Sequence, residues 1–214
     1  MQESHKRRND EIKGKRIAIL ISGRGSNMVA LAEAIRSGAV PNAHVALVLS
    51  DRSNAPGLRL AQERGIQTIV IERGARSKNE HESEIIAALQ AQDIDLICLA
   101  GYMRLLSRDF VQSFPERILN IHPSLLPSFP GLDAQKQAIE HGVKWTGCTV
   151  HLVDATLDGG PIIAQRAIPV FEDDTEKTLS ERLLAEEHLL YPEALALIAN
   201  GNYRVVGRRV LRKN

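Results

Sequence analysis

The feature that most constrains this 214-residue chain is an alternation of short apolar runs with helix-like segments over its first hundred residues. The first apolar run, residues 17–21, has no polar position, as expected of a strand buried on both faces of a parallel sheet. Similar runs lie at 44–49, 67–71 and 96–100, and helical patterns separate them at 28–37, 56–64 and 78–92. The alternation predicts a Rossmann-like α/β fold with a mostly parallel central sheet and helices on both faces.

The second half of the chain is less regular. Its expected elements are a short helix before Pro115, a strand at 118–121, a helix at about 134–140, strands at 149–153 and 162–168, a long helix at 178–200 and a hairpin at 203–211. Pro192 lies inside the long helix, where proline can introduce a bend. We expect a polar tail at residues 1–14 and a single domain at 15–214.

Composition excludes several classes of function. The 27 basic and 26 acidic residues leave a net charge of +1, which does not favour nucleic acid or an anionic membrane as a partner. Cys98 and Cys148 each lie in an apolar run and form no Cys-x-x-Cys pair, so we expect free thiols and a cytoplasmic protein. The seven histidines lack metal-ligand spacing, and we expect no metal.

A glycine-rich loop, Ser22-Gly23-Arg24-Gly25-Ser26-Asn27, joins the first expected strand to the first helix. A helix amino terminus offers free N–H groups to an anion, and glycines allow close approach, so the loop predicts a phosphate site. Met28 stands where a dinucleotide fingerprint needs its third glycine, and no Gly-Lys-Ser/Thr follows. A single phosphate on a small substrate therefore fits better, while a tight turn without a ligand remains the alternative.

Asn120 and His122 end the strand expected at 118–121, and their spacing of two places both on one face. Histidine can move protons near neutral pH, and an amide can donate to an oxygen that gains negative charge. The pair predicts direct attack of a substrate amine on a carbonyl. Asp158, in the turn Asp158-Gly159-Gly160, is the candidate carboxylate that would orient and charge the imidazole. The sequence alone does not show that Asp158 meets His122.

Four segments, residues 21–27, 100–107, 120–127 and 157–161, occur in an order that resembles the folate-dependent phosphoribosylglycinamide formyltransferase family of purine synthesis. The resemblance spans about residues 15–203. Segment 120–127 resembles the wider formyltransferase group, which includes methionyl-tRNA formyltransferases and formyltetrahydrofolate hydrolases. Loop 22–27 narrows the resemblance to the enzymes that act on glycinamide ribonucleotide. The resemblance implies a phosphate-binding half at 15–103 and a folate-binding and catalytic half at 104–214.

The resemblance also implies roles for individual residues. Those implied for catalysis are Asn120, His122 and Asp158, with Thr149 as a supporting hydroxyl. Those implied to bind the substrate phosphate and ribose are Gly25, Ser26, Asn27 and Glu187. Those implied to bind folate are Met103, Arg104, Leu105, Leu106, Asn120, Asp154, Ala155, Thr156, Leu157 and Asp158.

The implied reaction moves the formyl group of 10-formyltetrahydrofolate, a co-substrate, to the amine of glycinamide ribonucleotide in de novo purine (IMP) biosynthesis. The implied partners are these two small molecules, for a monomer or a homodimer. A formyltetrahydrofolate hydrolase and a non-enzymatic nucleotide-binding module are the alternatives. Three positions depart from the family pattern: Arg24 replaces a small or neutral residue, Asp133 replaces histidine, and Leu184 replaces a polar or basic residue near the phosphate.

Overall fold

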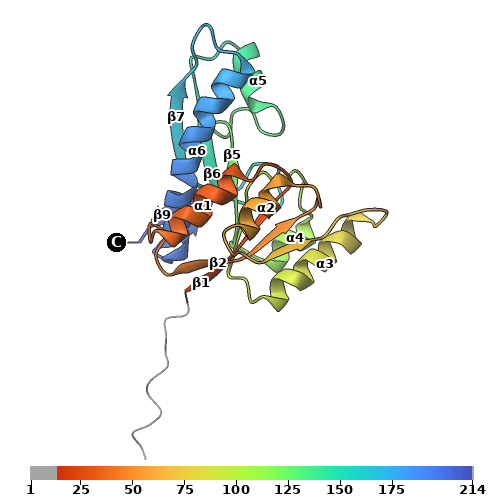
Figure 1. Cartoon of the computed structure of the whole chain (residues 1–214). Helices are drawn as coiled ribbons and strands as arrows, with labels where there is room; N and C mark the ends of the chain where they lie inside the picture. The colour runs from red at the N-terminus through yellow and green to blue at the C-terminus, as the bar shows by residue number, and fades with distance from the viewer. Residues whose placement is uncertain (1–13, 214) are drawn as a thin grey trace, which may run out of the picture.

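The computed structural model describes residues 14–213, which form one nine-stranded sheet flanked by helices (Figure 1). The strands are β1 (Lys15–Ile21), β2 (Ala43–Ser50), β3 (Thr68–Val70), β4 (Leu96–Leu99), β5 (Ile118–His122), β6 (Trp145–Leu152), β7 (Ile162–Pro169), β8 (Tyr203–Val206) and β9 (Arg209–Arg212). The helices are α1 (Ser26–Arg36), α2 (Pro56–Gln62), α3 (Lys78–Ala91), α4 (Arg108–Ser113), α5 (Ala134–Glu140) and α6 (Glu176–Ala199). The expected α/β fold is confirmed.

The strand order is β3-β2-β1-β4-β5-β6-β7-β9-β8. The strands from β3 to β5 run parallel, and β6 and β7 continue the sheet in antiparallel pairing. Because β1, β4 and β5 are neighbours, the loops that follow them meet at one edge of the sheet. In open parallel sheets this carboxyl edge is where ligands bind.

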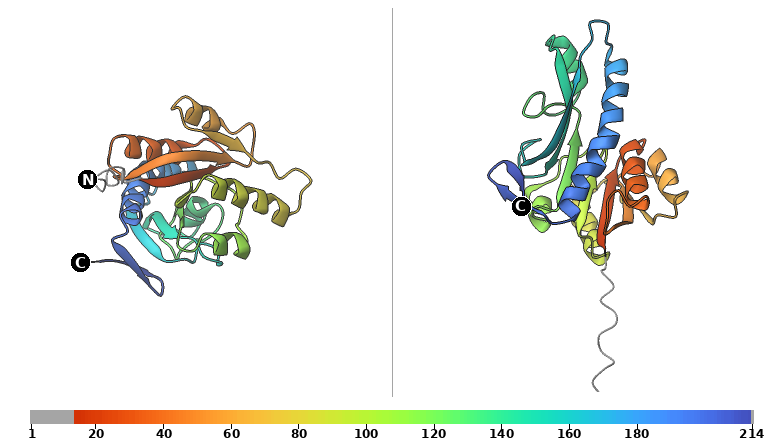
Figure 2. Two further views of the ribbon diagram at one scale, coloured as in Figure 1. Left: turned by 90° about the horizontal axis from the view of Figure 1, so that it is seen from below. Right: turned by 90° about the vertical axis from the view of Figure 1, so that its left-hand side faces the viewer.

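Two apolar layers cover the faces of the sheet, and seen from below α1 and α2 lie on the side opposite α3 and α4 (Figure 2). The layer on the α1 side includes Met28 and Leu31 of α1 and Leu195 of α6, packed on β1 and β5. The other layer places Ile85 of α3 and Phe110 of α4 against the opposite face. Helices on both faces explain why strand β1 has no polar position.

Helix α6 is a long helix that runs beside the sheet from the α5 end of the molecule to α1 (Figures 1 and 2). Its buried Tyr191 hydroxyl lies 3.1 Å from the Leu99 carbonyl oxygen and 3.0 Å from that of Leu119. This contact fixes α6 to β4 and β5. Because Glu187 is one turn earlier on the same helix face, the contact also fixes Glu187.

Several predicted boundaries were wrong, although each predicted helix or strand is present. Strand β6 begins four residues before the predicted 149, because Trp145–Leu152 pairs with Pro169–Ile162 along its length. Helix α1 begins at Ser26, two residues early, because Gly25 in the left-handed conformation starts it. Helix α6 continues through Pro192. Of the predicted tail, residues 1–13 lie outside the described part of the chain.

Within residues 14–213, no helix combines the length and apolar character needed to cross a membrane.

Candidate active site

The polar pair of β5 lies where the sheet changes from parallel to antiparallel pairing. Asn120 is paired in register with His151 of β6, and His122 with Thr149. Leu119 and Ile121 belong to the apolar layer under α1 and α6. Strand alternation therefore turns Asn120 and His122 together toward the other face, as predicted.

His122 is almost fully buried, and both of its ring nitrogens have neighbours. Nε2 lies 2.8 Å from the Phe129 carbonyl oxygen, to which it can donate a hydrogen bond. Nδ1 lies 3.4 Å from Oδ2 of Asp158. The expected meeting of His122 and Asp158 therefore occurs in the structure. It also follows that Nε2 must leave the Phe129 carbonyl before it can reach a substrate oxygen.

Asp158 is held by three groups from three different segments. Its Oδ2 accepts the Gly131 N–H at 2.8 Å as well as facing His122, and its Oδ1 lies 3.7 Å from Nε2 of His151. Burial alone would raise the pKa of Asp158, but His151, the Gly131 N–H and His122 together lower it below its ordinary value. The carboxylate is therefore ionised and can stabilise a positive imidazole beside it.

Asp158 has a positive φ of 47°, which side-chain-bearing residues rarely adopt. The turn around it requires a small neighbour: a Cβ added to Gly160 would lie 1.8 Å from the Leu152 carbonyl oxygen. Backbone strain of this kind is typical of functional sites. The Asp-Gly-Gly sequence thus permits a turn tight enough to bring the carboxylate against the end of β6.

His151 is a member of this cluster that the sequence reasoning missed. It is 2% exposed, its Nδ1 lies 2.9 Å from the Leu152 carbonyl oxygen, and its Nε2 lies 3.2 Å from Nδ2 of Asn120. The contact with Nε2 orients the Asn120 amide, and the same Nε2 lies 3.7 Å from Oδ1 of Asp158. A signal was available, because His151 follows Thr149 by two positions in an apolar strand and shares its face.

Thr149 lies beside the cluster but supports the loop rather than the reacting groups. Its buried hydroxyl donates to the Ser124 carbonyl at 2.7 Å and accepts the N–H of Leu126 at 3.1 Å. Gln165 donates to it from β7 at 2.9 Å. All of its contacts are therefore within the scaffold, and its role as a supporting hydroxyl stays a prediction.

The glycine loop places the amino terminus of α1 at the same edge of the sheet. Gly25 is the N-cap with φ 78°, and no side chain caps the first turn, whereas α3 and α6 each begin with a capping box. Gly25 also touches helix α2, since an added Cβ would lie 2.7 Å from Cα of Gly57. The first-turn N–H groups of α1 are therefore positioned, uncapped and suited to an anion.

Asn27 and Glu187 complete this site, which we call the phosphate cradle (residues 25–27 with Glu187). Nδ2 of Asn27 donates to Oε2 of Glu187 at 2.7 Å, although the two residues are 160 positions apart. Among residues 14–213, nothing forms a hydrogen bond with the buried Oδ1 of Asn27. Burial raises the pKa of Glu187, while the Asn27 hydrogen bond and the charge of Arg24 oppose the rise. Both side chains retain capacity for a ligand.

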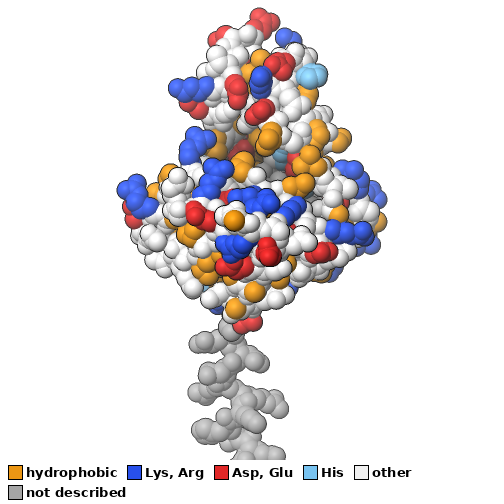
Figure 3. Space-filling model, turned by 90° about the vertical axis from the view of Figure 1, so that its right-hand side faces the viewer, with side chains coloured by type: hydrophobic (Ala, Val, Ile, Leu, Met, Phe, Trp, Pro, Cys, Tyr) orange, Lys and Arg blue, Asp and Glu red, His pale blue; other side chains and the backbone are white. Residues whose placement is uncertain are grey.

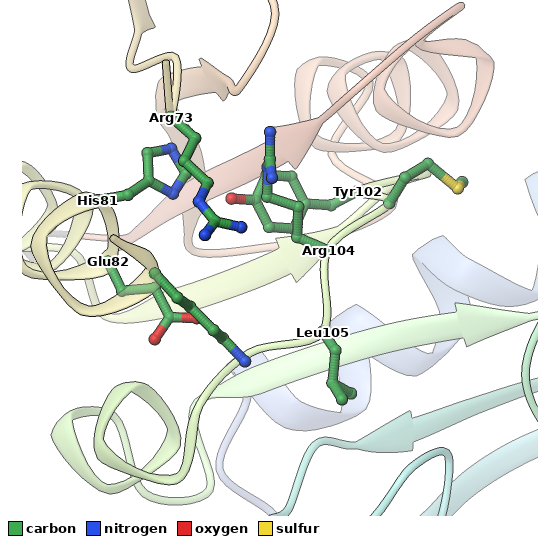
Figure 4. A pocket seen from close by; sticks show the side chains of 8 residues that line it. Arg73, His81, Glu82, Tyr102, Arg104 and Leu105 are labelled. Atoms are coloured by element: carbon green, nitrogen blue, oxygen red, sulfur yellow. The ribbon is translucent and has the colours of Figure 1, made fainter. Parts of the chain in front are cut away.

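Five of the ten residues implied to bind folate line two separate hollows. Met103, Arg104 and Leu105 line a cavity of about 210 Å³ with Arg73, Lys78, His81, Glu82 and Tyr102 (Figure 4). Asp154 and Ala155 line another of about 390 Å³, between the end of β6 and α4. Leu106 packs into the apolar layer on the α4 side of the sheet. The space-filling view shows a hollow between the narrower upper part and the broader lower part of the molecule, with Lys and Arg side chains gathered below it (Figure 3).

The segment implied to line the folate pocket is shaped locally. Asp154 Oδ1 accepts the Thr156 N–H at 2.8 Å and its hydroxyl at 2.5 Å, which folds residues 154–158 into a turn. Leu157 in that turn and Met103, in the segment after β4, are each more than half exposed. Arg104 is fixed differently, because its Nε donates to the buried Asp51 at 2.5 Å. Its guanidinium therefore belongs to the smaller cavity.

The site contains an amide donor, an imidazole and an ionised carboxylate, and no hydroxyl or thiol nucleophile paired with the imidazole. With an anion cradle at the same sheet edge, such a site is suited to stabilising the oxyanion of an acyl transfer to a substrate amine. The family model described as "Formyl transferase" matches residues 15–195, and the chain therefore belongs to the formyl transferase family.

Individual relatives agree with this assignment. Phosphoribosylglycinamide formyltransferase of Escherichia coli K12 is 39% identical over 190 residues, which cover 88% of this chain and 89% of that enzyme. Glycinamide ribonucleotide transformylase 1 of Symbiobacterium toebii has 50% identity and a TM-score of 0.92, covering 94% of this chain and 95% of that one. The trifunctional purine biosynthetic protein adenosine-3 of Drosophila melanogaster is 48% identical, but this chain spans only 14% of its length.

Proposed function

We propose that this protein transfers the formyl group of 10-formyltetrahydrofolate to the primary amine of glycinamide ribonucleotide, giving formylglycinamide ribonucleotide and tetrahydrofolate in purine biosynthesis. The observation that carries the proposal is that Asn120, His122, His151 and Asp158, which we call the catalytic cluster, lie at the same sheet edge as the phosphate cradle. They follow β5 and β1, which are separated only by β4. Two strand spacings amount to roughly 10 Å, about the length of a ribose phosphate with a small acyl-amine arm.

The two substrates have complementary places around the sheet edge. The phosphate would lie on the α1 amino terminus, and a ribose hydroxyl would meet Glu187 and the unpartnered oxygen of Asn27. Folate would enter from the side of residues 103–106 and 154–158. The cationic side chains Arg73, Lys78 and Arg104 offer partners to the carboxylates of its glutamate tail.

The reaction then needs one carbon–nitrogen bond to form and another to break. The amine nitrogen attacks the formyl carbon, and negative charge develops on the formyl oxygen. The Asn120 amide and the charged imidazole of His122 would stabilise this oxygen, after the imidazole turns from the Phe129 carbonyl. Asp158 Oδ2, 3.4 Å from Nδ1, would stabilise the positive charge on this imidazole. One proton passes from the attacking amine to the folate nitrogen as the carbon–nitrogen bond to folate breaks.

Holding both substrates in one crevice supplies much of the rate enhancement. Proximity of two well-oriented reactants is worth up to about 7–11 kcal/mol. The protein provides no covalent intermediate in this scheme, which agrees with the nature of the cluster. Cys98 and Cys148 are buried, and burial raises the pKa of each thiol to about 12.

Initial-rate assays test the proposal directly. Purified protein is mixed with 10-formyltetrahydrofolate, with and without glycinamide ribonucleotide, and the folate product is followed by absorbance. The proposal expects product only when the ribonucleotide is present, and its loss in His122→Ala. Equal product without the ribonucleotide would identify a hydrolase. Binding of the ribonucleotide without turnover, unaffected by His122→Ala, would identify a non-enzymatic binding module.

A further inference from the structure

Arg24 is the residue of the glycine loop that the proposed reaction leaves without a role. It lies between Gly23 and Gly25, and both glycines are fixed by helix α2. The Gly57 N–H donates to the Gly23 carbonyl at 3.1 Å, and Gly25 lies in contact with Gly57. Arg24 is exposed at this rigid position, directly before the first turn of α1.

The arginines beside α6 that lie near Glu187 in sequence or in space have ion-pair partners of their own. Arg166 binds Glu186 and Glu193 of α6, and Arg182 binds Asp174 and the Pro169 carbonyl. Within the described part of the chain, Arg24 makes no hydrogen bond or ion pair. Arg24 directly precedes Gly25 of the phosphate cradle, and its charge opposes the rise in the pKa of Glu187.

The charges of the cradle do not balance without a cation. A phosphate monoester carries about −1.5 to −2 at neutral pH, whereas a helix amino terminus supplies roughly +0.5. Glu187 adds a buried carboxyl group within the same site, only 8% exposed. Leu184, one turn before Glu187 on α6, is apolar and offers no hydrogen-bond donor. A positive side chain close to the first turn of α1 would therefore strengthen the binding of a phosphate monoester.

We propose that Arg24 binds the substrate phosphate and supplies the cation that Leu184 does not provide. This inference rests on the proposed function and specifies how its phosphorylated substrate is held. Arginine suits the role, because its planar guanidinium can donate two parallel hydrogen bonds to phosphate oxygens. The buried, unpartnered Oδ1 of Asn27 is a separate sign that the cradle awaits a ligand, since it can accept a hydrogen bond from a sugar hydroxyl.

The test is steady-state kinetics of Arg24→Ala with the ribonucleotide as the varied substrate. The phosphate lies away from the reacting amine, so its contact strengthens ground state and transition state alike. We expect KM to rise roughly tenfold with kcat within about twofold, as for loss of one charge-assisted hydrogen bond. Arg24→Lys keeps the charge and should recover part of the lost affinity. Arg36→Ala removes the same charge from the far end of α1 and should leave KM unchanged.

A competing explanation is that Arg24 acts only through Glu187. A double-mutant cycle separates the two roles, because independent contacts give additive effects. If Arg24 contacts the phosphate, Arg24→Ala raises KM by the same factor in a Glu187→Gln background. If the factor disappears in that background, or if Arg24→Ala leaves KM unchanged in the wild-type background, the inference is wrong.

Calorimetric titration with the ribonucleotide alone keeps this test separate from the proposed function. A wild-type protein that binds the ribonucleotide but does not formylate it would contradict the proposed function. The Kd ratio of Arg24→Ala to wild type would still decide the role of Arg24, with a tenfold ratio expected and a ratio of one overturning it. A wild-type protein that does not bind the ribonucleotide would overturn both.

Discussion

Asp158 in the catalytic cluster and Glu187 in the phosphate cradle are both shielded carboxyl groups, yet their surroundings act in opposite directions. Asp158 has two imidazoles and a backbone N–H around it, and its pKa is lowered. Glu187 has one neutral amide donor and a more distant arginine, and burial raises its pKa. Protein groups thus stabilise the negative charge of Asp158. Glu187 has one hydrogen-bond donor in the protein and keeps free hydrogen-bonding capacity for a ligand.

This difference between the two carboxyl groups fits a role in the reaction for Asp158 and a role in substrate binding for Glu187. A charge that must act in the transition state is most effective when its surroundings are arranged in advance. A group that recognises a substrate hydroxyl needs free hydrogen-bonding capacity until that substrate arrives. We therefore expect changes at the catalytic cluster to lower kcat and changes at the cradle to raise KM.

The largest expected effect is that of Asp158→Asn. The amide can still accept the Gly131 N–H, but it carries no negative charge to stabilise a positive imidazole at His122. We expect kcat to fall by about 10²–10⁴, the usual range for loss of acid–base catalysis, with little change in KM for the ribonucleotide. Glu187→Gln is the matched carboxyl-to-amide control and should mainly raise KM. Equal effects of the two substitutions on kcat would contradict the comparison.

Asn120→Ala tests the donor of the same cluster. Loss of one oxyanion donor costs roughly 10²–10³ in rate. The substitution also removes the amide that contacts Nε2 of His151, so the measurement is kcat together with the thermal unfolding midpoint. A variant that folds normally and retains near-wild-type turnover would exclude Asn120 as the oxyanion donor.

Gly25→Ala tests whether the cradle depends on its close contact with α2. Alanine at this position meets left-handed strain and a backbone atom of Gly57 at 2.7 Å. The strain costs about 1–2 kcal/mol and overpacking a further 1–3 kcal/mol of unfolding free energy. Gly38→Ala is the control, because Gly38 has a similar φ of 81° but no atom near its added Cβ. Urea denaturation should show a larger loss for Gly25→Ala, and equal losses would exclude the contact with Gly57.

The parts of this site that depend on local pattern were predictable from sequence. Strand alternation placed Asn120 and His122 on one face, and the glycine loop indicated the uncapped start of α1. Both inferences need only the geometry of a single strand or a single turn. The resemblance carried the remaining assignments, including Glu187, whose long helix gives no local sign of a site.

Contacts that depend on the register between distant segments were not predictable. The sequence does not fix which residue of β6 lies opposite Asn120, so His151 was missed. It also does not show that Gly57 locks the glycine loop or that Phe129 accepts a hydrogen bond from His122. The predicted folate set illustrates the same point, since residues 103–105 and residues 154–155 line different hollows.

The smallest expected effect is the pH dependence of stability, which has opposite signs at the two carboxyl groups. The folded pKa of Asp158 lies below its ordinary 3.8, so its stabilising contribution is present above that pH and is lost as the pH falls through the folded value. The folded pKa of Glu187 lies above its ordinary 4.5, so its contribution is present below 4.5 and is lost as the pH rises through the folded value.

Unfolding free energies of Asp158→Asn and Glu187→Gln, measured from pH 3 to pH 7 without substrates, therefore diverge from wild type in opposite directions. Asp158→Asn should become relatively less stable as the pH rises from 3. Glu187→Gln should become relatively more stable above 4.5, because it removes a buried carboxylate that no cation contacts directly. Saturating ribonucleotide should abolish the gain of Glu187→Gln, since the bound sugar supplies the missing hydrogen bonds. If Glu187→Gln instead destabilises the substrate-free protein at pH 7, Glu187 is a structural residue, and the contrast between the two carboxyl groups does not hold.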